Sequence, residues 1–299
     1  MNIEIYKGKN KLEYKRFVFP AGEVGIKLNI TEAFRRSNGN INIVARVQNS
    51  EDLMALAMIN NALDQDFCLD QSACRRELYL TYLPYGRQDR VCDKGEAFSL
   101  KVFANYINFL KFDTVHIFDP HSDVAPALFD NVVVYTQLDI IDKFASFRNR
   151  CLGPGKYFVS PDAGANKKTS ALAKYFDHKT FIRADKLRDL SNGNILETIV
   201  YCDDLKGADV IIADDLCDGG RTFIELGKAL KAKNCGKVIL YVTHGIFSKG
   251  IETVLYNGVD EIYFTNSYRE SDYYMNVLFD EKRIDNVFRL NLEEVFFIN

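Results

Sequence analysis

The chain has 299 residues, of which 47% are apolar and 26% charged, and its formal net charge is −3. This is the composition of a globular protein of about two domains, and it excludes a disulfide miniprotein, a collagen and a wholly disordered chain. The charge argues against a nucleic-acid-coating protein. No apolar run approaches the ~18 residues of a membrane span, and the N-terminal MNIEIYKGKN lacks a signal-peptide core. We therefore expect a soluble, cytoplasmic protein without nucleic-acid or membrane partners.

Apolar, β-branched runs alternate with helical patterns along the chain. Strands are predicted at residues 41–47, 77–83, 114–118, 157–160, 180–184, 210–213, 237–243 and 261–265. Helices are predicted at residues 50–63, 97–110, 169–176 and 222–233. This order is typical of parallel sheets flanked by helices, and the apolar rhythm lapses near residues 136–150. We predict the α/β class with two similar domains, residues 1–140 and 141–299.

The cysteines and histidines do not predict a zinc site. Seven cysteines form no C-x-x-C pair, and the four histidines lie apart from them in the sequence. We interpret the cysteines as reduced thiols.

The most informative segment is VIIADDLCDGGRTFIEL, residues 210–226. A strand ends in Asp214 and Asp215, and a glycine loop leads into a helix whose Thr222 and Glu225 have capping-box spacing. Backbone N–H groups of such a loop, together with the helix dipole, can hold a phosphate, and paired aspartates can accept hydrogen bonds from ribose hydroxyls or hold a metal through water. An Asp-Gly-rich capping turn is the simpler alternative.

The segment resembles the D-D-x-x-D-T-x-G-T loop shared by the type I phosphoribosyltransferase and ribose-phosphate pyrophosphokinase families. Further segments resemble the pyrophosphokinases in the order of that family and cover nearly the full chain. They are FPAGE (19–23), NSEDLM (49–54), PYGRQDR (84–90), SLKVFANYI (99–107), DPHSD (119–123), SPDAGA (160–165), KLR (186–188), THGIFS (243–248) and FTN (264–266).

The resemblance implies a phosphoribosyltransferase-like fold and transfer of the diphosphoryl group of ATP to the C1 hydroxyl of ribose 5-phosphate. It implies Mg²⁺, ATP as co-substrate, and a homo-oligomer in which a neighbouring subunit completes the adenine site. The residues that match ATP-binding positions are Phe19, Glu23, Arg87, Gln88 and His121.

The remaining matches concern the sugar, the metal and the phosphoryl transfer. Lys186 and Arg188 match the catalytic basic pair, and His121 and Asp162 match the metal residues. Positions that match substrate-binding residues are Asp162, Ala163, Gly164, Asp214, Asp215, Asp218, Gly219, Gly220, Arg221 and Thr222.

Three departures from the family pattern bear on specificity. Ala21 stands where the family commonly has Asp, Arg90-Val91-Cys92 replaces a more polar stretch, and residues 218–222 lack the first threonine and carry Arg221 in place of glycine. The altered loop leaves open a 5′-substituted ribose acceptor such as ADP-ribose. A non-catalytic regulatory subunit of the same fold and a phosphoribosyltransferase are further alternatives.

Overall fold

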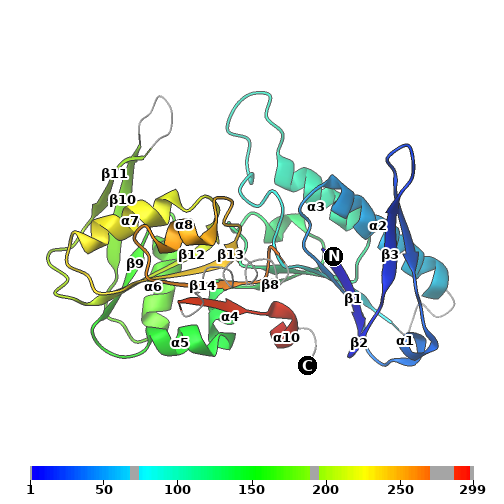
Figure 1. The fold of residues 1–299 in the computed structure, drawn as a ribbon. Coiled ribbons are helices and arrows are strands. Elements are labelled where there is room, and N and C mark those ends of the chain that lie inside the picture. The colour runs from blue at the N-terminus through cyan, green and yellow to red at the C-terminus, as the bar shows by residue number, and fades with distance from the viewer. Residues whose placement is uncertain (1, 68–73, 189–194, 270–285, 297–299) are drawn as a thin grey trace. The chain divides into compact units, whose positions relative to one another are not determined.

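The computed structural model describes residues 2–67, 74–188, 195–269 and 286–296. They form two compact units (Figure 1). The N-terminal unit comprises residues 1–136, 267–270 and 292–299, and the C-terminal unit comprises residues 137–266 and 271–291.

The N-terminal unit is built on a six-stranded sheet with the order β2-β1-β5-β6-β7-β8. Its strands are β1 (Ile3–Lys7), β2 (Asn10–Lys11), β5 (Ile41–Ala45), β6 (Arg76–Leu80), β7 (Thr114–Phe118) and β8 (Val132–Tyr135). Strands β5 to β8 are parallel, and β1 pairs antiparallel with both β2 and β5. The carboxyl ends of β6 and β7 therefore lie side by side.

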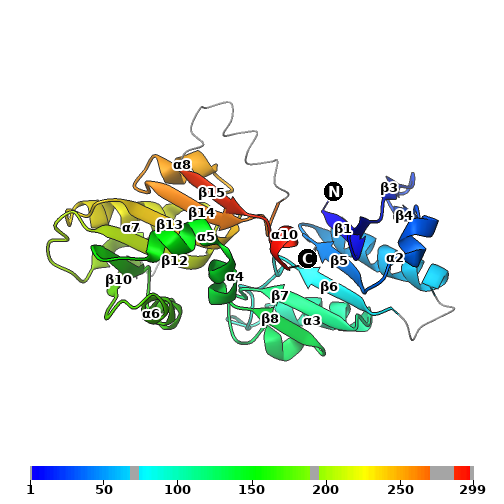
Figure 2. The ribbon, with the colours of Figure 1, turned by 90° about the horizontal axis from the view of Figure 1, so that it is seen from below.

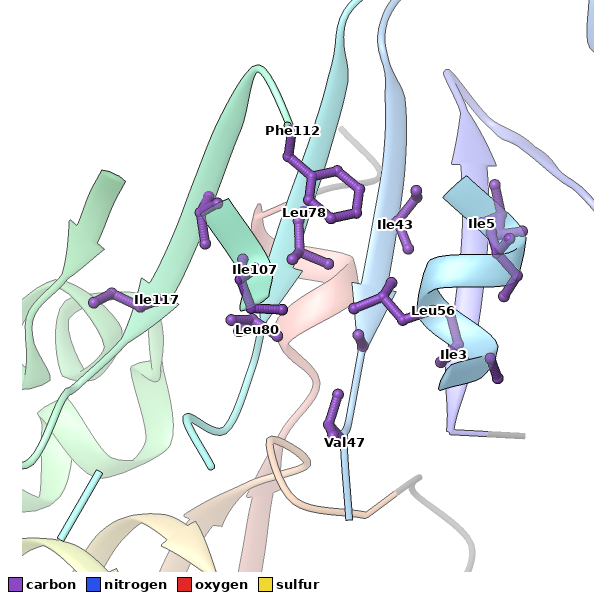
Figure 3. Packing of buried hydrophobic residues seen from close by; sticks show 14 of the residues in the cluster. Ile3, Ile5, Ile43, Val47, Leu56, Leu78, Leu80, Ile107, Phe112 and Ile117 are labelled. Atoms are coloured by element: carbon purple, nitrogen blue, oxygen red, sulfur yellow. The ribbon is translucent and has the colours of Figure 1, made fainter. Parts of the chain in front are cut away.

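Two long helices, α2 (Ser50–Phe67) and α3 (Ser99–Phe109), connect β5 to β6 and β6 to β7. The short helix α1 (Glu32–Arg36) precedes β5, and the 3-10 helix η1 (Pro126–Leu128) lies in the connection from β7 to β8. Leu56 of α2 and Ile107 of α3 pack against Ile43, Leu78 and Ile117 of the sheet in one apolar core (Figure 3). The helical spacing of apolar residues in α2 and α3 thus corresponds to the face that covers the sheet.

A separate hairpin is formed by β3 (Tyr14–Val18) and β4 (Val24–Leu28), which pair antiparallel. It lies beyond β1 in both views (Figures 1 and 2). Its tip is FPAGE, closed by hydrogen bonds from Phe19 N–H to Glu23 O (2.8 Å) and from Gly22 N–H to Phe19 O (2.8 Å).

The C-terminal unit contains a seven-stranded sheet with the order β11-β10-β9-β12-β13-β14-β15. Its strands are β9 (Lys156–Ser160), β10 (Ile182–Arg188), β11 (Ile195–Val200), β12 (Asp209–Cys217), β13 (Val238–Gly245), β14 (Glu261–Thr265) and β15 (Val287–Leu290). All neighbours are parallel except β10 and β11.

Helices cover both faces of this sheet. They are α4 (Gln137–Lys143), α5 (Ala145–Cys151), α6 (Asn166–Tyr175), α7 (Arg221–Lys231) and α8 (Ile251–Leu255). Ile212 faces a core with Leu226 of α7, whereas the preceding Ile211 faces a second core with Leu172 of α6 and Phe147 of α5. Burial on both faces explains why the central strands are continuous apolar runs.

The predicted α/β class is confirmed, and the domain limits differ in two details. The second unit begins at Gln137 rather than at residue 141, because the predicted lapse is occupied by α4 and α5. The C-terminal α10 (Leu292–Phe296) belongs to the first unit, where the ring of Phe296 lies 5.4 Å from that of Phe118 and 4.8 Å from that of Tyr135.

The cysteines and the absence of apolar spans in the sequence can both be compared with the structure. The described cysteines are free thiols, as interpreted, and Cys68 lies outside the described residues. Across the part of the chain that the structure describes, no helix is long and apolar enough to cross a membrane.

Candidate functional site

The chemistry-bearing residues of the C-terminal unit gather at the carboxyl ends of its parallel strands. Strand β12 is central, with β9 on one side and β13 on the other. It carries Asp214 and Asp215, while Asp162 follows β9 by two residues. Loops at this edge are where open α/β sheets bind ligands.

Asp214 and Asp215 are adjacent carboxyl groups in direct contact. The backbone N–H of Asp215 donates to Oδ1 of Asp214 at 2.9 Å. Burial, followed by the negative charge of Asp215, raises the pKa of Asp214 well above its ordinary value, and the charge of Asp162 acts in the same direction. Three carboxyl groups therefore share this edge, and a ligand that offers hydroxyl donors or a cation would relieve their repulsion.

The loop after these aspartates leads into α7. Gly220 is the N-cap residue, with φ of 75°, and a Cβ at this position would overlap Cγ2 of Val254. Gly220 supplies no side-chain cap, so the first N–H groups of α7 are not capped in that way. Such a helix start is suited to a phosphate, and Gly219, Arg221 and Thr222 flank it.

The predicted capping box is wrong. The helix begins at Arg221, which places Thr222 inside its first turn instead of at the cap. Glu225 instead forms an ion pair with Lys228 at 3.2 Å.

Asp162 is joined directly to Lys186. Lys186 Nζ lies 2.7 Å from Asp162 Oδ2, and Asp162 Oδ1 accepts the Ala165 N–H at 3.1 Å. Burial of Asp162 opposes its ionisation, but the hydrogen bond and charge of Lys186 outweigh this and lower its pKa. The structure thus brings together the residues matched to catalysis and to metal binding, which lie 24 positions apart in sequence.

Ala163 and Gly164 follow Asp162 directly in the sequence. Ala163 and Gly164 are exposed in the turn between β9 and α6, where backbone N–H groups can face an anion. Arg188 is the last residue of β10, and its side chain lies outside what the structure describes.

In the N-terminal unit, the loops after β6 and β7 come together around Asp89. Asp89 is buried and accepts two hydrogen bonds from Arg90, Nε to Oδ1 at 2.7 Å and Nη2 to Oδ2 at 3.1 Å. These bonds, with a smaller contribution from nearby His121, lower its pKa to about 2. A Cβ on Gly86 would lie 3.9 Å from Cβ of His121, which also places the two loops side by side. The sequence matches omitted Asp89, although it stands within PYGRQDR.

Arg87, Gln88 and His121 are exposed on these adjoining loops. Among the described residues, no ion pair involves Arg87. Its guanidinium can therefore bind a phosphate without first leaving a partner in this part of the chain.

Phe19 and Glu23 are not brought to these loops. They lie at the tip of the hairpin beyond β1, where Phe19 is 50% exposed and its ring packs edge-on at 5.1 Å from that of Phe17 (Figure 1). An exposed aromatic ring at a hairpin tip is suited to stacking on a planar ligand.

Asp162 is the residue of this edge whose compatibility with magnesium can be tested from its contacts. The carboxylate of Asp162 supplies the oxygen ligands that Mg²⁺ prefers, yet both of its oxygens are engaged, one by Lys186 and one by the Ala165 N–H. Among the described residues, no group of three or more His, Cys, Asp or Glu side chains is arranged to hold a metal. The carboxylate fits a cation once Lys186 moves away.

Comparisons with known proteins find relatives of one kind. The model of the phosphoribosyl transferase domain matches residues 135–277. A ribose-phosphate pyrophosphokinase of Shewanella oneidensis is 28% identical over 253 residues, which cover 83% of this chain and 76% of the relative. One of a Marinomonas species is 30% identical over 222 residues, which cover 73% of this chain and 67% of the relative.

A solved structure supports the same fold. The crystal structure of phosphoribosylpyrophosphate synthetase from Mycobacterium smegmatis matches with a TM-score of 0.74 at 21% identity, over 95% of this chain and 87% of that one. The phosphoribosyltransferase-like α/β fold expected from the sequence is thereby confirmed. With the two-carboxylate strand end, the glycine loop and relatives of this name along most of its length, the chain belongs to the ribose-phosphate pyrophosphokinase family of enzymes.

Proposed function

We propose that the protein transfers the diphosphoryl group of ATP to the C1 hydroxyl of ribose 5-phosphate, giving phosphoribosyl diphosphate and AMP. The observation that carries this proposal is the grouping of Asp162, Asp214 and Asp215 with the uncapped start of α7 at one edge of the C-terminal sheet. This edge offers acceptors for ribose hydroxyls beside a phosphate-binding helix start. It agrees with the names of the relatives.

The ribose is held by the carboxyl groups of Asp214, Asp215 and Asp218, and its 5′-phosphate by Gly219, Gly220, Arg221 and Thr222. The C1 hydroxyl oxygen attacks the β-phosphorus of ATP. The bond from that phosphorus to the α,β-bridging oxygen breaks, AMP departs, and the hydroxyl proton passes to water. No covalent enzyme intermediate is required, so positioning and charge stabilisation supply the catalysis.

Lys186 and Arg188 stabilise the negative charge that develops on the transferring phosphates. Lys186 Nζ lies 2.7 Å from Asp162 Oδ2. Catalysis therefore requires an exchange of partners, in which the ammonium leaves the carboxylate and contacts phosphate oxygen. Ala163 and Gly164 offer backbone N–H groups to the diphosphate.

Asp162 of the C-terminal unit and His121 of the N-terminal unit are each proposed as an Mg²⁺ ligand. When bound, this ion neutralises phosphate oxygens and makes the β-phosphorus easier to attack.

Arg87 and Gln88 bind the ATP phosphates, while Phe19 and Glu23 contact adenine. From the resemblance of FPAGE to the family's adenine-contacting loop, we propose that the hairpin tip serves the ATP site of a neighbouring copy in a cytoplasmic homo-oligomer.

The test is an incubation with ATP, Mg²⁺ and ribose 5-phosphate, followed by chromatography of the nucleotides. The proposal predicts AMP in an amount equal to the sugar diphosphate formed. ADP as the main product, or no acceptor-dependent product, would contradict it. Sedimentation of the wild-type chain and of Phe19→Ala tests the oligomer separately.

A second candidate acceptor is ADP-ribose, whose second ribose also has a free C1 hydroxyl. The observation that favours it is Arg221, an exposed cation at the first position of α7. Comparing AMP release with the two acceptors at equal concentration decides between them, because the acceptor for which the loop is shaped gives the higher kcat/KM.

A further inference from the structure

The turn that follows β13 is hydrogen-bonded to residues 217–220, which are called the sugar-phosphate loop because they are proposed to bind the 5′-phosphate of the ribose. The N–H groups of Ile246 and Phe247 donate to the carbonyl oxygen of Cys217 at 2.9 and 3.1 Å. The N–H of Ser248 donates to the carbonyl oxygen of Asp218 at 3.2 Å. Residues 246–250 therefore form a turn that lies directly against the sugar-phosphate loop inside the C-terminal unit.

The turn of residues 246–250 is anchored in the core. The ring of Phe247 is buried and lies 5.4 Å from the ring of Phe264 in an edge-on contact. The N–H of Gly250 donates to the carbonyl oxygen of Phe247 at 2.9 Å, and the hydroxyl of Thr253 donates to the carbonyl oxygen of Lys249 at 2.6 Å. The backbone that carries Lys249 is thus fixed on both sides.

The side chain of Lys249 lies over the loop. A Cβ built on Gly219 would be 3.6 Å from both Cδ and Cε of Lys249, which is ordinary van der Waals contact. Lys249 is exposed, and within the described ranges no carboxylate forms an ion pair with its ammonium. A positive charge without a described ion-pair partner therefore stands beside the residue that precedes the N-cap of α7.

We propose that Lys249 is a further substrate-binding residue whose ammonium binds the anionic 5′-phosphate of the ribose acceptor. The inference rests on the proposed function for the identity of the ligand. It adds to Arg221 and the backbone N–H groups a second cation, supplied by a different turn. An ammonium on a flexible stem can follow either a phosphate monoester or the nearer phosphate of a diphosphate ester, so ribose 5-phosphate and ADP-ribose share the chemistry that it recognises.

The experiment compares the full-length chain with Lys249→Gln, Lys249→Arg and the control Lys174→Gln, which alters an exposed lysine of α6. The apparent KM for each acceptor and for ATP is measured by AMP formation. Loss of a charged hydrogen bond predicts an acceptor KM raised about tenfold or more in Lys249→Gln. The KM for ATP and kcat stay within about twofold, and Lys249→Arg restores most of the acceptor affinity.

Calorimetric titration of each variant with ribose 5-phosphate and with ADP-ribose, without ATP, separates this inference from the proposed function. An increased dissociation constant in Lys249→Gln for at least one acceptor supports the role of Lys249 and identifies which phosphate it contacts. Unchanged constants for both acceptors would overturn it, even if AMP is formed. An equal rise of the KM for ATP in the kinetic experiment would also overturn it, because that result indicates a general disturbance of the fold.

Discussion

The ammonium of Lys186 lies 2.7 Å from Oδ2 of Asp162, and only 7% of the lysine side chain is exposed. Lys186, which is proposed to stabilise the transferring phosphates, is therefore ion-paired with Asp162, which is proposed to bind the metal. Each side chain neutralises the charge of the other. Phosphate oxygens and a cation can together replace this pair, because they offer the ammonium a new anion and the carboxylate a new cation.

Removing this lysine should affect turnover more than binding. Lys186→Ala is expected to lower kcat by about a hundredfold to a thousandfold, because it removes a donor aimed at charge that develops in the transition state. The KM for ribose 5-phosphate should change little, since the sugar is assigned to Asp214 and Asp215. Steady-state AMP formation measures both values. Lys174→Ala is the matched control, and an equal loss in both variants would refute the assignment.

Substitution of two arginines in one loop should have different effects, one on ATP binding and the other on stability. Arg87→Ala is expected to raise the KM for ATP about tenfold or more and to leave the melting temperature unchanged, since no described ion pair holds this side chain. Arg90→Ala removes both hydrogen bonds to the buried Asp89 and should lower the melting temperature. Kinetics and thermal denaturation of both variants check this contrast. The opposite pattern would exchange the two roles.

Two adjacent glycines should differ in tolerance. Gly220→Ala is expected to destabilise the chain by about 1–3 kcal/mol, because φ is 75° there and the new Cβ meets Val254. Gly219→Ala meets only the stem of Lys249 at 3.6 Å and should cost less than about 1 kcal/mol. Urea denaturation of the two variants provides the comparison. Equal losses would show that the loop does not depend on the left-handed conformation of Gly220.

His116 should make stability depend on pH. It is buried, its ring stacks 4.0 Å from that of Tyr79, and Nε2 lies 3.0 Å from Glu77 Oε2. Burial lowers its pKa below 6.5, with Glu77 acting in the opposite direction. As the pH falls through 6.5, the unfolded chain therefore takes up the proton before the folded chain does. The free energy of unfolding falls as the pH falls from 6.5 toward the lower pKa of the folded chain.

The variant His116→Gln should show a flatter pH dependence than the parent between pH 7.5 and 5.5. Urea titrations at several pH values give the slopes. Identical slopes in the two proteins would assign the pH dependence to other groups.

The sequence predicts the central elements well because their signal is local. Strands β5, β7, β9 and β14 are apolar runs whose ends the structure reproduces within two residues. The hairpin β3–β4 was not among the predicted strands, because Lys15 and Arg16 interrupt the apolar residues of β3 and Lys27 interrupts those of β4. Strand β8, at an edge of its sheet, was also missed, although VVVY is apolar.

The candidate site divides in the same way. The pattern at residues 210–222 identifies the carboxylates and the glycine loop, since strand, loop and helix are continuous in sequence. The ion pair of Asp162 with Lys186 depends on the pairing of β9 with β10 and on side-chain conformations. The position of Lys249 depends on hydrogen bonds between two separate turns. Neither has a signal in the residues alone.

The central claim is diphosphoryl transfer in one step, and the fate of the β-phosphate of ATP tests it most directly. The protein is incubated with Mg²⁺, ribose 5-phosphate and ATP labelled at the β-phosphorus, and the labelled products are separated. The account predicts that the label moves to the sugar product and that unlabelled AMP remains. Label retained in ADP would show transfer of the γ-phosphoryl group alone and would contradict the account.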